Sequence, residues 1–490
     1  MSEWLKARQS GVLLHISSLP DGNLGASAYG FVDFLKQSGF SVWQVLPLGP
    51  TLANGSPYQS PSANAGNPEL IDLHRLVEWG WLLDSELTGS GGSEDSDVSQ
   101  AESLRKRAFN RFVEQGQPEK NPDYRQFCES EAWWLDDFAL FQALKVAFEG
   151  APWWDWPADF RSRRTETLED ARERLDEEIG FAHFEQFVFE LQWRRLRDYA
   201  NDNGIKIFGD LPIFVAEDAV DVWVRPELFE LDANRRPTFI AGVPPDYFSE
   251  TGQRWGNPLY AWDAHQSEAY DWWVKRMARQ FELYDILRID HFRGFESYWS
   301  IPVECETAID GQWRPGPGAA LFDALEKRLG TVPVVAEDLG IITSAVEALR
   351  DTLAYPGMKI LQFAFDGRAD NPYLPHNLDA LSVTYTGTHD NDTTAGWFEG
   401  LDENSRASVR SYFGFPAEPV TSMLIRAALA SVSRLAVVPV QDLLGLDTSA
   451  RMNTPGVAEG NWRWRLTDLD ALEASSETWR RLNQTYGRAP

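Results

Sequence analysis

Arg288, Asp290 and His291 bring a cation, a carboxylate and an imidazole together directly after the apolar residues Ile286 and Leu287. A buried strand that ends here delivers all three side chains to one point. A neighbouring cation lowers the pKa of a carboxyl group and keeps it ionised, which is the state that the nucleophile of a retaining glycosidase requires. For this motif taken alone, a strand that ends in a solvated charge pair is an equally good interpretation.

Two further carboxylates follow apolar runs, and they favour a catalytic site over a solvated charge pair. Glu337 comes after Val334–Ala336, where burial is expected to raise its pKa, as a general acid/base requires. Asp390 follows His389 and is suited to bind sugar hydroxyls, although an Asp that caps a turn fits this position alone as well. Together the three acids predict Asp290 as the nucleophile, Glu337 as the acid/base and Asp390 as the stabiliser of the transition state.

The elements that must position these acids are short, continuous apolar runs, as is typical of buried parallel strands. Helical patterns lie between them. About eight such strands alternating with helices predict a (β/α)8 TIM barrel, whose chemistry lies at the carboxyl ends of the strands. A doubly wound open sheet is the alternative. The runs are Val12–His15, Val42–Pro47, Ile205–Asp210, Ile286–Asp290, Val334–Asp338, Met358–Phe363, Leu381–Thr386 and Leu435–Val440.

The chain is much longer than a plain barrel, which needs about 250 residues. We therefore expect residues 1–490 to form a single catalytic barrel with large, mainly helical insertions. One inserted subdomain is predicted at about residues 51–203, between the second and third strands. Another, carrying a lid over the site, is predicted at about residues 216–284, between the third and fourth strands. No separate C-terminal β-domain is expected, since only about 50 residues follow the last run.

The composition restricts the classes of molecule that the protein is expected to bind. The formal charge of -29 disfavours nucleic acid and anionic membranes and is compatible with a neutral substrate. The two cysteines, Cys128 and Cys305, indicate no disulfide framework, and no phosphate-binding or metal-binding motif is present. The N-terminus lacks the apolar core of a signal peptide, and no apolar run is long enough to cross a membrane. These features predict a cytoplasmic protein.

Several motifs make the chain resemble the amylomaltase (disproportionating enzyme) family of 4-alpha-glucanotransferases, within the alpha-amylase-like group. The most specific is the segment 241–258, which resembles the family's loop over the acceptor side of the active site. The other matching motifs are Ser56–Gln59, Gly209–Phe214, Ala336–Gly340, Gly387–Asn391 and Arg451–Gly456.

The resemblance implies transfer of an α-1,4-glucan segment through a covalent glucosyl-Asp290 intermediate to the 4-hydroxyl of another sugar. Expected donors are maltooligosaccharides, amylose, starch or glycogen, and expected acceptors are glucose or maltooligosaccharides. No metal or organic cofactor is implied. The implied substrate contacts are Ser56, Tyr58, Asp210, Arg288, His291 and His389, with Tyr247, Phe248, Gln253 and Trp255 in the loop.

Two other functions use the same residues. A plain α-glucan hydrolase needs the same three acids, but it gains nothing from an aromatic lid that keeps water from the intermediate. A non-catalytic glycan-binding protein has no need for all three acids. The transferase is therefore the function that the sequence favours.

Overall fold

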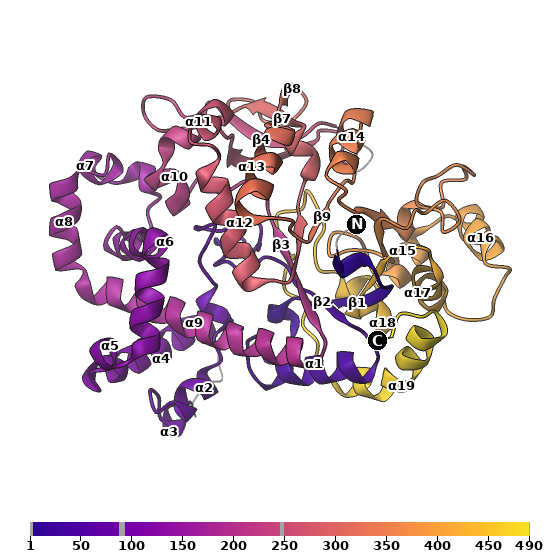
Figure 1. Ribbon diagram of the computed structural model, residues 1–490, viewed down its shortest axis with the longest axis horizontal. Coiled ribbons are helices and arrows are strands. Elements are labelled where there is room, and N and C mark those ends of the chain that lie inside the picture. The colour runs from indigo at the N-terminus through magenta and orange to yellow at the C-terminus, as the bar shows by residue number, and fades with distance from the viewer. Residues whose placement is uncertain (1–2, 88–93, 246–248, 490) are drawn as a thin grey trace.

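The computed structural model describes residues 3–87, 94–245 and 249–489. Its centre is a closed barrel of eight parallel strands, which confirms the predicted fold class (Figure 1). Each of the eight apolar runs overlaps one of these strands, and the strand residues are almost all buried, as a sheet covered on both faces requires. The strands are β1 (Gln9–Leu13), β2 (Val42–Gln44), β3 (Lys206–Leu211), β6 (Ile286–Ile289), β9 (Val334–Ala336), β10 (Gly357–Ile360), β11 (Ser382–Tyr385) and β12 (Leu435–Pro439).

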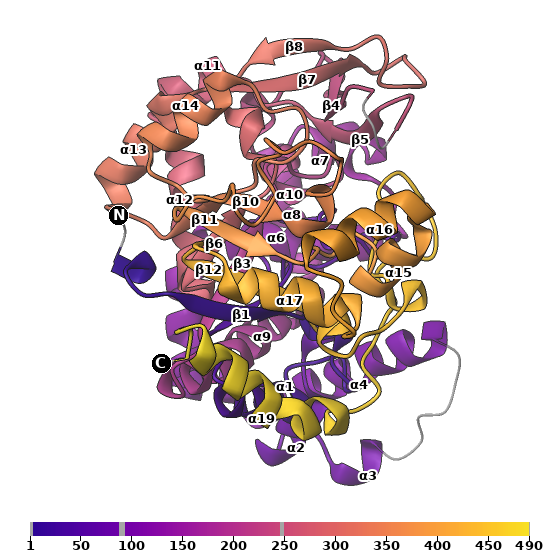
Figure 2. The same ribbon diagram turned by 90° about the vertical axis from the view of Figure 1, so that its right-hand side faces the viewer.

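The strands follow one another around the barrel in chain order, and β12 closes the ring by pairing with β1. The C-terminal helix α19 (Asp470–Thr485) lies against α1 (Ala26–Gln37), the helix that follows β1 (Figure 2). Helices outside the two long insertions are α1 (Ala26–Gln37), α13 (Ala319–Leu329), α14 (Ser344–Thr352), α15 (Thr394–Gly400), α16 (Glu403–Tyr412), α17 (Val420–Ala430), α18 (Val440–Leu443) and α19 (Asp470–Thr485).

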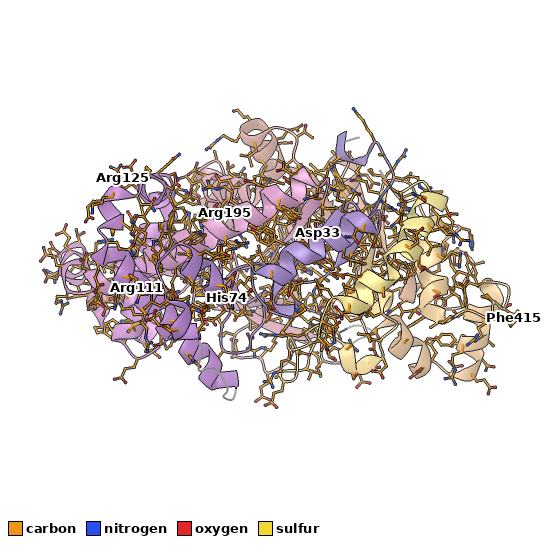
Figure 3. The ribbon with its side chains drawn as sticks, turned by 90° about the horizontal axis from the view of Figure 1, so that it is seen from below. Asp33, His74, Arg111, Arg125, Arg195 and Phe415 are labelled. Atoms are coloured by element: carbon orange, nitrogen blue, oxygen red, sulfur yellow. The ribbon has the colours of Figure 1, made fainter. Side chains whose placement is uncertain are left out.

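Between β2 and β3 the described residues form helices that extend the molecule to one side of the barrel (Figure 1). Seen from below, Arg111 and Arg125 mark this end, and Phe415 lies at the opposite end (Figure 3). Two glutamines of α9 (Asp176–Asp202) hold the segment that follows β2. Gln186 forms hydrogen bonds with the backbone N–H and the carbonyl of Gly66, and Gln192 does the same with Asp72. The helices are α2 (Leu73–Glu78), α3 (Asp84–Leu87), α4 (Glu94–Glu114), α5 (Gln117–Lys120), α6 (Pro122–Ala147), α7 (Ala158–Arg161), α8 (Thr165–Arg174) and α9 (Asp176–Asp202).

Between β3 and β6 lie the helices α10 (Val220–Val224), α11 (Trp262–Ser267) and α12 (Asp271–Leu283). This part of the chain also contributes two strands to a four-stranded antiparallel sheet that the sequence analysis did not predict. The sheet, here called the rim sheet, has the order β5 (Gln253–Pro258), β4 (Phe239–Val243), β7 (Ser297–Pro302) and β8 (Gln312–Pro315) (Figure 2). Its strands β7 and β8 come after β6, so the sheet joins segments on both sides of the Asp290 strand.

Among the described residues, no helix combines the length and the apolar character needed to cross a bilayer. The cytoplasmic location stays a prediction.

The third strand passes very close to a buried aromatic ring. A Cβ atom at Gly209 meets the ring of Tyr284 at 2.2 Å, and Tyr284 is fully buried. We predict that Gly209→Ala lowers the free energy of unfolding by about 1–3 kcal/mol, the usual penalty for overpacking a core. Urea denaturation measures this loss.

The matched control is Gly400→Ala, because a Cβ atom there meets nothing within 4 Å. Gly400 ends helix α15, so alanine at this position is expected to be neutral or stabilising. Equal urea midpoints for Gly209→Ala and the wild-type protein contradict the close packing of β3.

Candidate active site

Neighbouring strands of the barrel bring the predicted catalytic residues to one edge. Ile289 pairs with Ala336 across β6 and β9, so Asp290 and Glu337 occupy the next positions on adjacent strands. Backbone hydrogen bonds continue this register past the strand ends: Glu337 donates to Ile289 at 3.0 Å, and Asp290 donates to Leu211 at 3.0 Å. Adjacent strands lie about 4.8 Å apart. The barrel therefore sets the spacing of the two acids.

Arg288 is a buried cation between two carboxylates. Its Nη1 atom donates to both carboxylate oxygens of Asp210, at 2.8 and 2.7 Å, and its Nη2 atom lies 2.9 Å from Oδ1 of Asp290. Tyr58 also donates to Asp210, at 2.7 Å. Asp210 pairs directly with Arg288 in the sheet register. The structure thus brings Tyr58, Asp210, Arg288 and Asp290 into a single group joined by hydrogen bonds and ion pairs.

The pKa of Asp290 moves in the direction opposite to the predicted one. Burial raises its pKa to about 6, and the negative charges of Asp210 and Asp390 add to this rise. Arg288 does favour the ionised form, as predicted, but its effect is smaller than that of burial. The prediction of a lowered pKa was wrong because it considered the neighbouring cation and left out the desolvation of the site.

Glu337 is buried and held by backbone groups. Its Oε2 atom accepts a hydrogen bond from the His291 N–H at 2.7 Å, and its Oε1 atom accepts one from the Leu339 N–H at 2.9 Å. His291 adopts a left-handed conformation with φ of 50°, which turns the chain directly after Asp290. Burial raises the pKa of Glu337 to about 8, and the charge of Asp290 contributes. The predicted rise is confirmed, and the group is mostly protonated at pH 7.

Asp390 is the most exposed of the three acids, with 42% of its side chain accessible. Its Oδ1 atom accepts a hydrogen bond from Asn453 at 2.6 Å and lies 3.4 Å from Nε2 of His389. Arg451 donates to the backbone carbonyl of Asp390 at 2.8 Å. Asn453 and Arg451 were not among the predicted site residues, although their segment carries a family motif.

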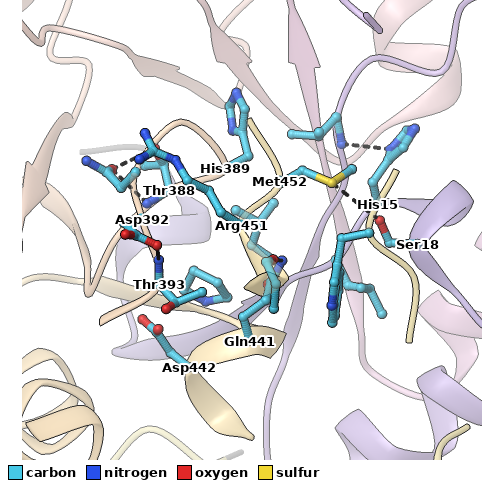
Figure 4. A pocket seen from close by; sticks show the side chains of 17 residues that line it. His15, Ser18, Thr388, His389, Asp392, Thr393, Gln441, Asp442, Arg451 and Met452 are labelled. Carbon is cyan, nitrogen blue, oxygen red and sulfur yellow. Dashed lines mark hydrogen bonds between the residues drawn. The ribbon is translucent and has the colours of Figure 1, made fainter. Parts of the chain in front are cut away.

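His389 and Tyr58 form a stacked pair beside the acids. Their ring centroids lie 5.4 Å apart with an angle of 13° between the planes, and the Tyr58 hydroxyl is 2.8 Å from Nε2 of His389. Burial lowers the pKa of His389 and lowers that of the neighbouring His15 to about 3, so both rings are neutral at pH 7. A pocket lies behind His389, with His15 and Arg451 also in its lining (Figure 4).

Of the predicted lid residues that the structure describes, Trp255 lies next to the turn that follows Asp290. The Trp255 ring packs edge-on against His291, with centroids 4.8 Å apart, and its Nε1 donates to Gln253 at 3.1 Å. The predicted contacts Tyr247 and Phe248 lie outside the described residues. Ser56 accepts a hydrogen bond from the Tyr58 backbone at 3.3 Å and so belongs to the turn that presents Tyr58.

Within the described ranges, no group of three or more His, Cys, Asp or Glu side chains is arranged to hold a metal ion. The polar residues of the site instead form ion pairs and hydrogen bonds with one another. A closed parallel barrel with three acids and a buried arginine at the carboxyl ends of its strands is the arrangement of a carbohydrate-active (β/α)8 enzyme.

Comparison with known proteins defines this class further. The profile of the 4-alpha-glucanotransferase family, glycoside hydrolase family 77, matches residues 14–471. The chain therefore belongs to this family, and its activity is glycosyl transfer on glucans.

Similar proteins cover nearly the whole chain. A 4-alpha-glucanotransferase of Thermus thermophilus is 50% identical over 94% of this chain and 95% of its own length. The chloroplastic 4-alpha-glucanotransferase DPE1 of Arabidopsis thaliana is 43% identical over 98% of this chain and 86% of its own length. Among solved structures, an amylomaltase from Streptococcus agalactiae in complex with acarbose has a TM-score of 0.95 at 39% identity, covering 99% of this chain and 100% of its own.

The raised pKa of Glu337 has a consequence for stability. An unfolded glutamate has a pKa near 4.3, so between about pH 4.3 and 8 the unfolded chain loses a proton that the folded protein keeps. The free energy of unfolding then falls as pH rises, by at most about 1.4 kcal/mol per pH unit. We predict that Glu337→Gln removes this slope. The melting temperature of the variant, relative to that of the wild type, then increases from pH 5 to pH 8.

Thermal unfolding at pH 5, 6, 7 and 8 measures the difference, with the exposed Glu459→Gln as the matched control. A difference between Glu337→Gln and wild type that stays constant over this range rules out a raised pKa for Glu337 in the folded protein.

Proposed function

We propose that the protein transfers α-1,4-glucan segments by a retaining double displacement, with Asp290 as nucleophile and Glu337 as general acid/base. The observation that carries this proposal is the pair of adjacent strand ends, one with an arginine-paired carboxylate and the other with a buried carboxyl that accepts two backbone hydrogen bonds. At pH 7 a pKa of about 6 leaves Asp290 mostly ionised, and a pKa of about 8 leaves Glu337 mostly protonated. These are the states that the first step requires.

In the first step a carboxylate oxygen of Asp290 forms a bond to the anomeric carbon of the donor. The bond from that carbon to the leaving 4-oxygen breaks, and Glu337 gives its proton to this oxygen. In the second step Glu337 takes the proton of an acceptor 4-hydroxyl, whose oxygen bonds to the anomeric carbon while Asp290 leaves. One glycosidic bond is broken and one is formed, with retention of configuration.

The remaining polar groups are suited to hold the reacting sugar. Among the described residues, the Nε2 atom of His291 is buried and has no hydrogen-bond partner, so a sugar hydroxyl can supply one. Asp390, which is partly exposed beside the neutral His389, can accept from sugar hydroxyls and stabilise positive charge at the anomeric carbon. We assign Tyr58, Asp210 and Arg288 to the same subsite because they form one bonded group with Asp290.

Transfer succeeds over hydrolysis only if water is kept away while an acceptor sugar is held. We assign this task to the segment 241–258, with Gln253, Trp255, Tyr247 and Phe248 as acceptor contacts. The placement of Trp255 against His291 supports it, because the indole lies next to the turn that follows Asp290. We also propose that residues 51–203 and 216–284 act as inserted subdomains, the first contributing Ser56 and Tyr58 to the site and the second the lid.

The substrate class follows from the family and from the neutral character of sugars. We propose α-1,4-glucans such as maltooligosaccharides, amylose, starch or glycogen as donors, and glucose or maltooligosaccharides as acceptors. The acarbose complex of the similar amylomaltase supports this class, because acarbose is an oligosaccharide mimic. A surface with a formal charge of -29 also disfavours anionic partners.

Incubation of the protein with maltotriose tests the reaction type. We predict free glucose together with a series of longer maltooligosaccharides, while the total number of reducing ends stays constant, because every broken bond is replaced by a new one. Chromatography of the products and a reducing-end assay on the same samples give both quantities. Short products with a rising number of reducing ends show a hydrolase instead, and no reaction with maltotriose or longer glucans favours a glycan-binding protein.

Replacement of the nucleophile tests the residue assignment. We predict that Asp290→Asn lowers turnover of maltotriose on the order of 10³-fold or more, the scale on which loss of a covalent nucleophile acts in other enzymes. The variant is expected to fold, because the change removes a charge from a crowded acidic site. The matched control is Asp310→Asn, which replaces an exposed acid on the loop between β7 and β8. Wild-type turnover by Asp290→Asn excludes Asp290 as the nucleophile.

A further inference from the structure

Arg293 lies in the short turn that follows Asp290 and takes no part in the mechanism above. The turn is the 3-10 helix Phe292–Phe295, and Arg293 is only 4% exposed. Within the described part of the chain it forms no ion pair with a carboxylate. Its guanidinium instead donates to the backbone carbonyl of Ile341 and, at 3.1 Å, to the hydroxyl of Ser297. It also lies over the ring of Trp313, 3.7 Å from the centroid.

The contact with Ile341 reaches the loop that carries Glu337. This loop runs from the end of β9 to the start of α14, and its exposed end includes Gly340 with φ of 84° and Ile341, which is 47% accessible. The beginning of the loop is held to the turn by two hydrogen bonds, from His291 N–H to the Glu337 carboxylate and from Phe292 N–H to the Glu337 carbonyl. Arg293 supplies the corresponding attachment at the far end.

The position of this loop bears directly on the Glu337 carboxyl. One of its oxygens accepts a hydrogen bond from the Leu339 N–H within the loop, and the other accepts one from His291 in the turn. A shift of the loop relative to the turn therefore pulls the two donors apart and rotates the carboxyl group. Misplacement of a catalytic group by about 1 Å can lower a rate on the order of 10²-fold.

The contact with Trp313 connects the same point to the lid. Trp313 lies on β8 and pairs with Trp299 of β7, which pairs with Gly242 of β4. Strand β4 in turn pairs with β5 at Gln253, one of the lid residues. Figure 2 shows this rim sheet running along the same side of the molecule as α13 and α14. Arg293 is thus in contact with the turn after the nucleophile, the loop after the acid/base and the sheet that bears the lid.

We propose that Arg293 is a positioning residue for Glu337, joining the acid/base loop to the Asp290 turn and to the rim sheet. The proposal rests on the role of Glu337 as general acid proposed above. It assigns to Arg293 no contact with substrate. Its effect is to keep Glu337 where it can protonate the leaving oxygen.

The role can be tested with two glycosyl donors, because the leaving group of one must be protonated and that of the other need not be. Departure of a sugar from maltotriose requires the general acid, whereas fluoride leaves α-maltosyl fluoride as an anion and requires no proton. For Arg293→Lys we predict a loss on the order of tenfold in kcat with maltotriose, since general acid catalysis contributes about 10²–10⁴-fold. The initial burst of fluoride release from α-maltosyl fluoride is expected to stay within about twofold of the wild type, because attack by Asp290 does not use the general acid.

Three controls keep the outcomes distinct. Trp313→Ala removes the partly exposed ring under the guanidinium and is expected to give the same donor-selective loss, but a smaller one, in a protein that folds. Arg314→Lys changes the next residue, which pairs with Glu230 and not with the catalytic loops, and is expected to leave both donors unaffected. Glu337→Gln is expected to show the donor-selective loss in its strongest form.

The positioning role is overturned if Arg293→Lys lowers the rates with both donors equally, or lowers neither, while Glu337→Gln still lowers the rate with maltotriose selectively. If Glu337→Gln itself lowers the rates with both donors equally, Glu337 is not the general acid. In that case the proposed mechanism fails, and the role of Arg293 fails with it.

Discussion

The buried guanidinium of Arg288 is the interaction on which the site depends. Desolvating a cation costs several kcal/mol unless carboxylates lie against it, and here Asp210 does so from the adjacent strand β3 and Asp290 from the end of the same strand β6. A third acid, Asp390, lies close enough to Asp210 and Asp290 for its charge to raise their pKa values. Tyr58 then connects Asp210 to His389, so a single charge organises groups that come from four parts of the chain.

Burial and the positive charge of Arg288 have opposite effects on the pKa values of Asp290 and Glu337. At Asp290 burial outweighs the arginine, and at Glu337 it also outweighs two backbone hydrogen bonds that favour the ionised form. The two pKa values rise by different amounts, because Asp290 pairs directly with Arg288, whereas Glu337 does not. This difference separates an ionised from a protonated carboxyl at neutral pH, and it lets two chemically similar side chains take opposite roles.

The barrel sets the positions of the catalytic acids, and we propose that the insertions enclose them. Parallel strands in register place Asp290 and Glu337 at equivalent heights, and that placement depends on backbone hydrogen bonds that are insensitive to the surrounding loops. The residues to which we assign this enclosure come from outside the barrel strands: Tyr58 from the insertion after β2, and Trp255 from the rim sheet. Enclosure is what distinguishes transfer from hydrolysis in the proposed mechanism, so the choice of reaction lies with the insertions more than with the three acids.

The sequence by itself indicated the eight barrel strands and placed Asp290 and Glu337 directly after two of them, whereas Asp390 lies in the loop that follows β11. Buried parallel strands have short, continuous apolar sequences, and a polar residue directly after such a run must lie at the strand end. Only the tertiary structure decided the rim sheet, the Asn453–Asp390 bond, the Arg293–Ile341 contact and the raised pKa of Asp290. Each of these joins residues from different elements or depends on the enclosure of the whole site, and no local pattern of residue types records how much water the folded chain removes from a side chain.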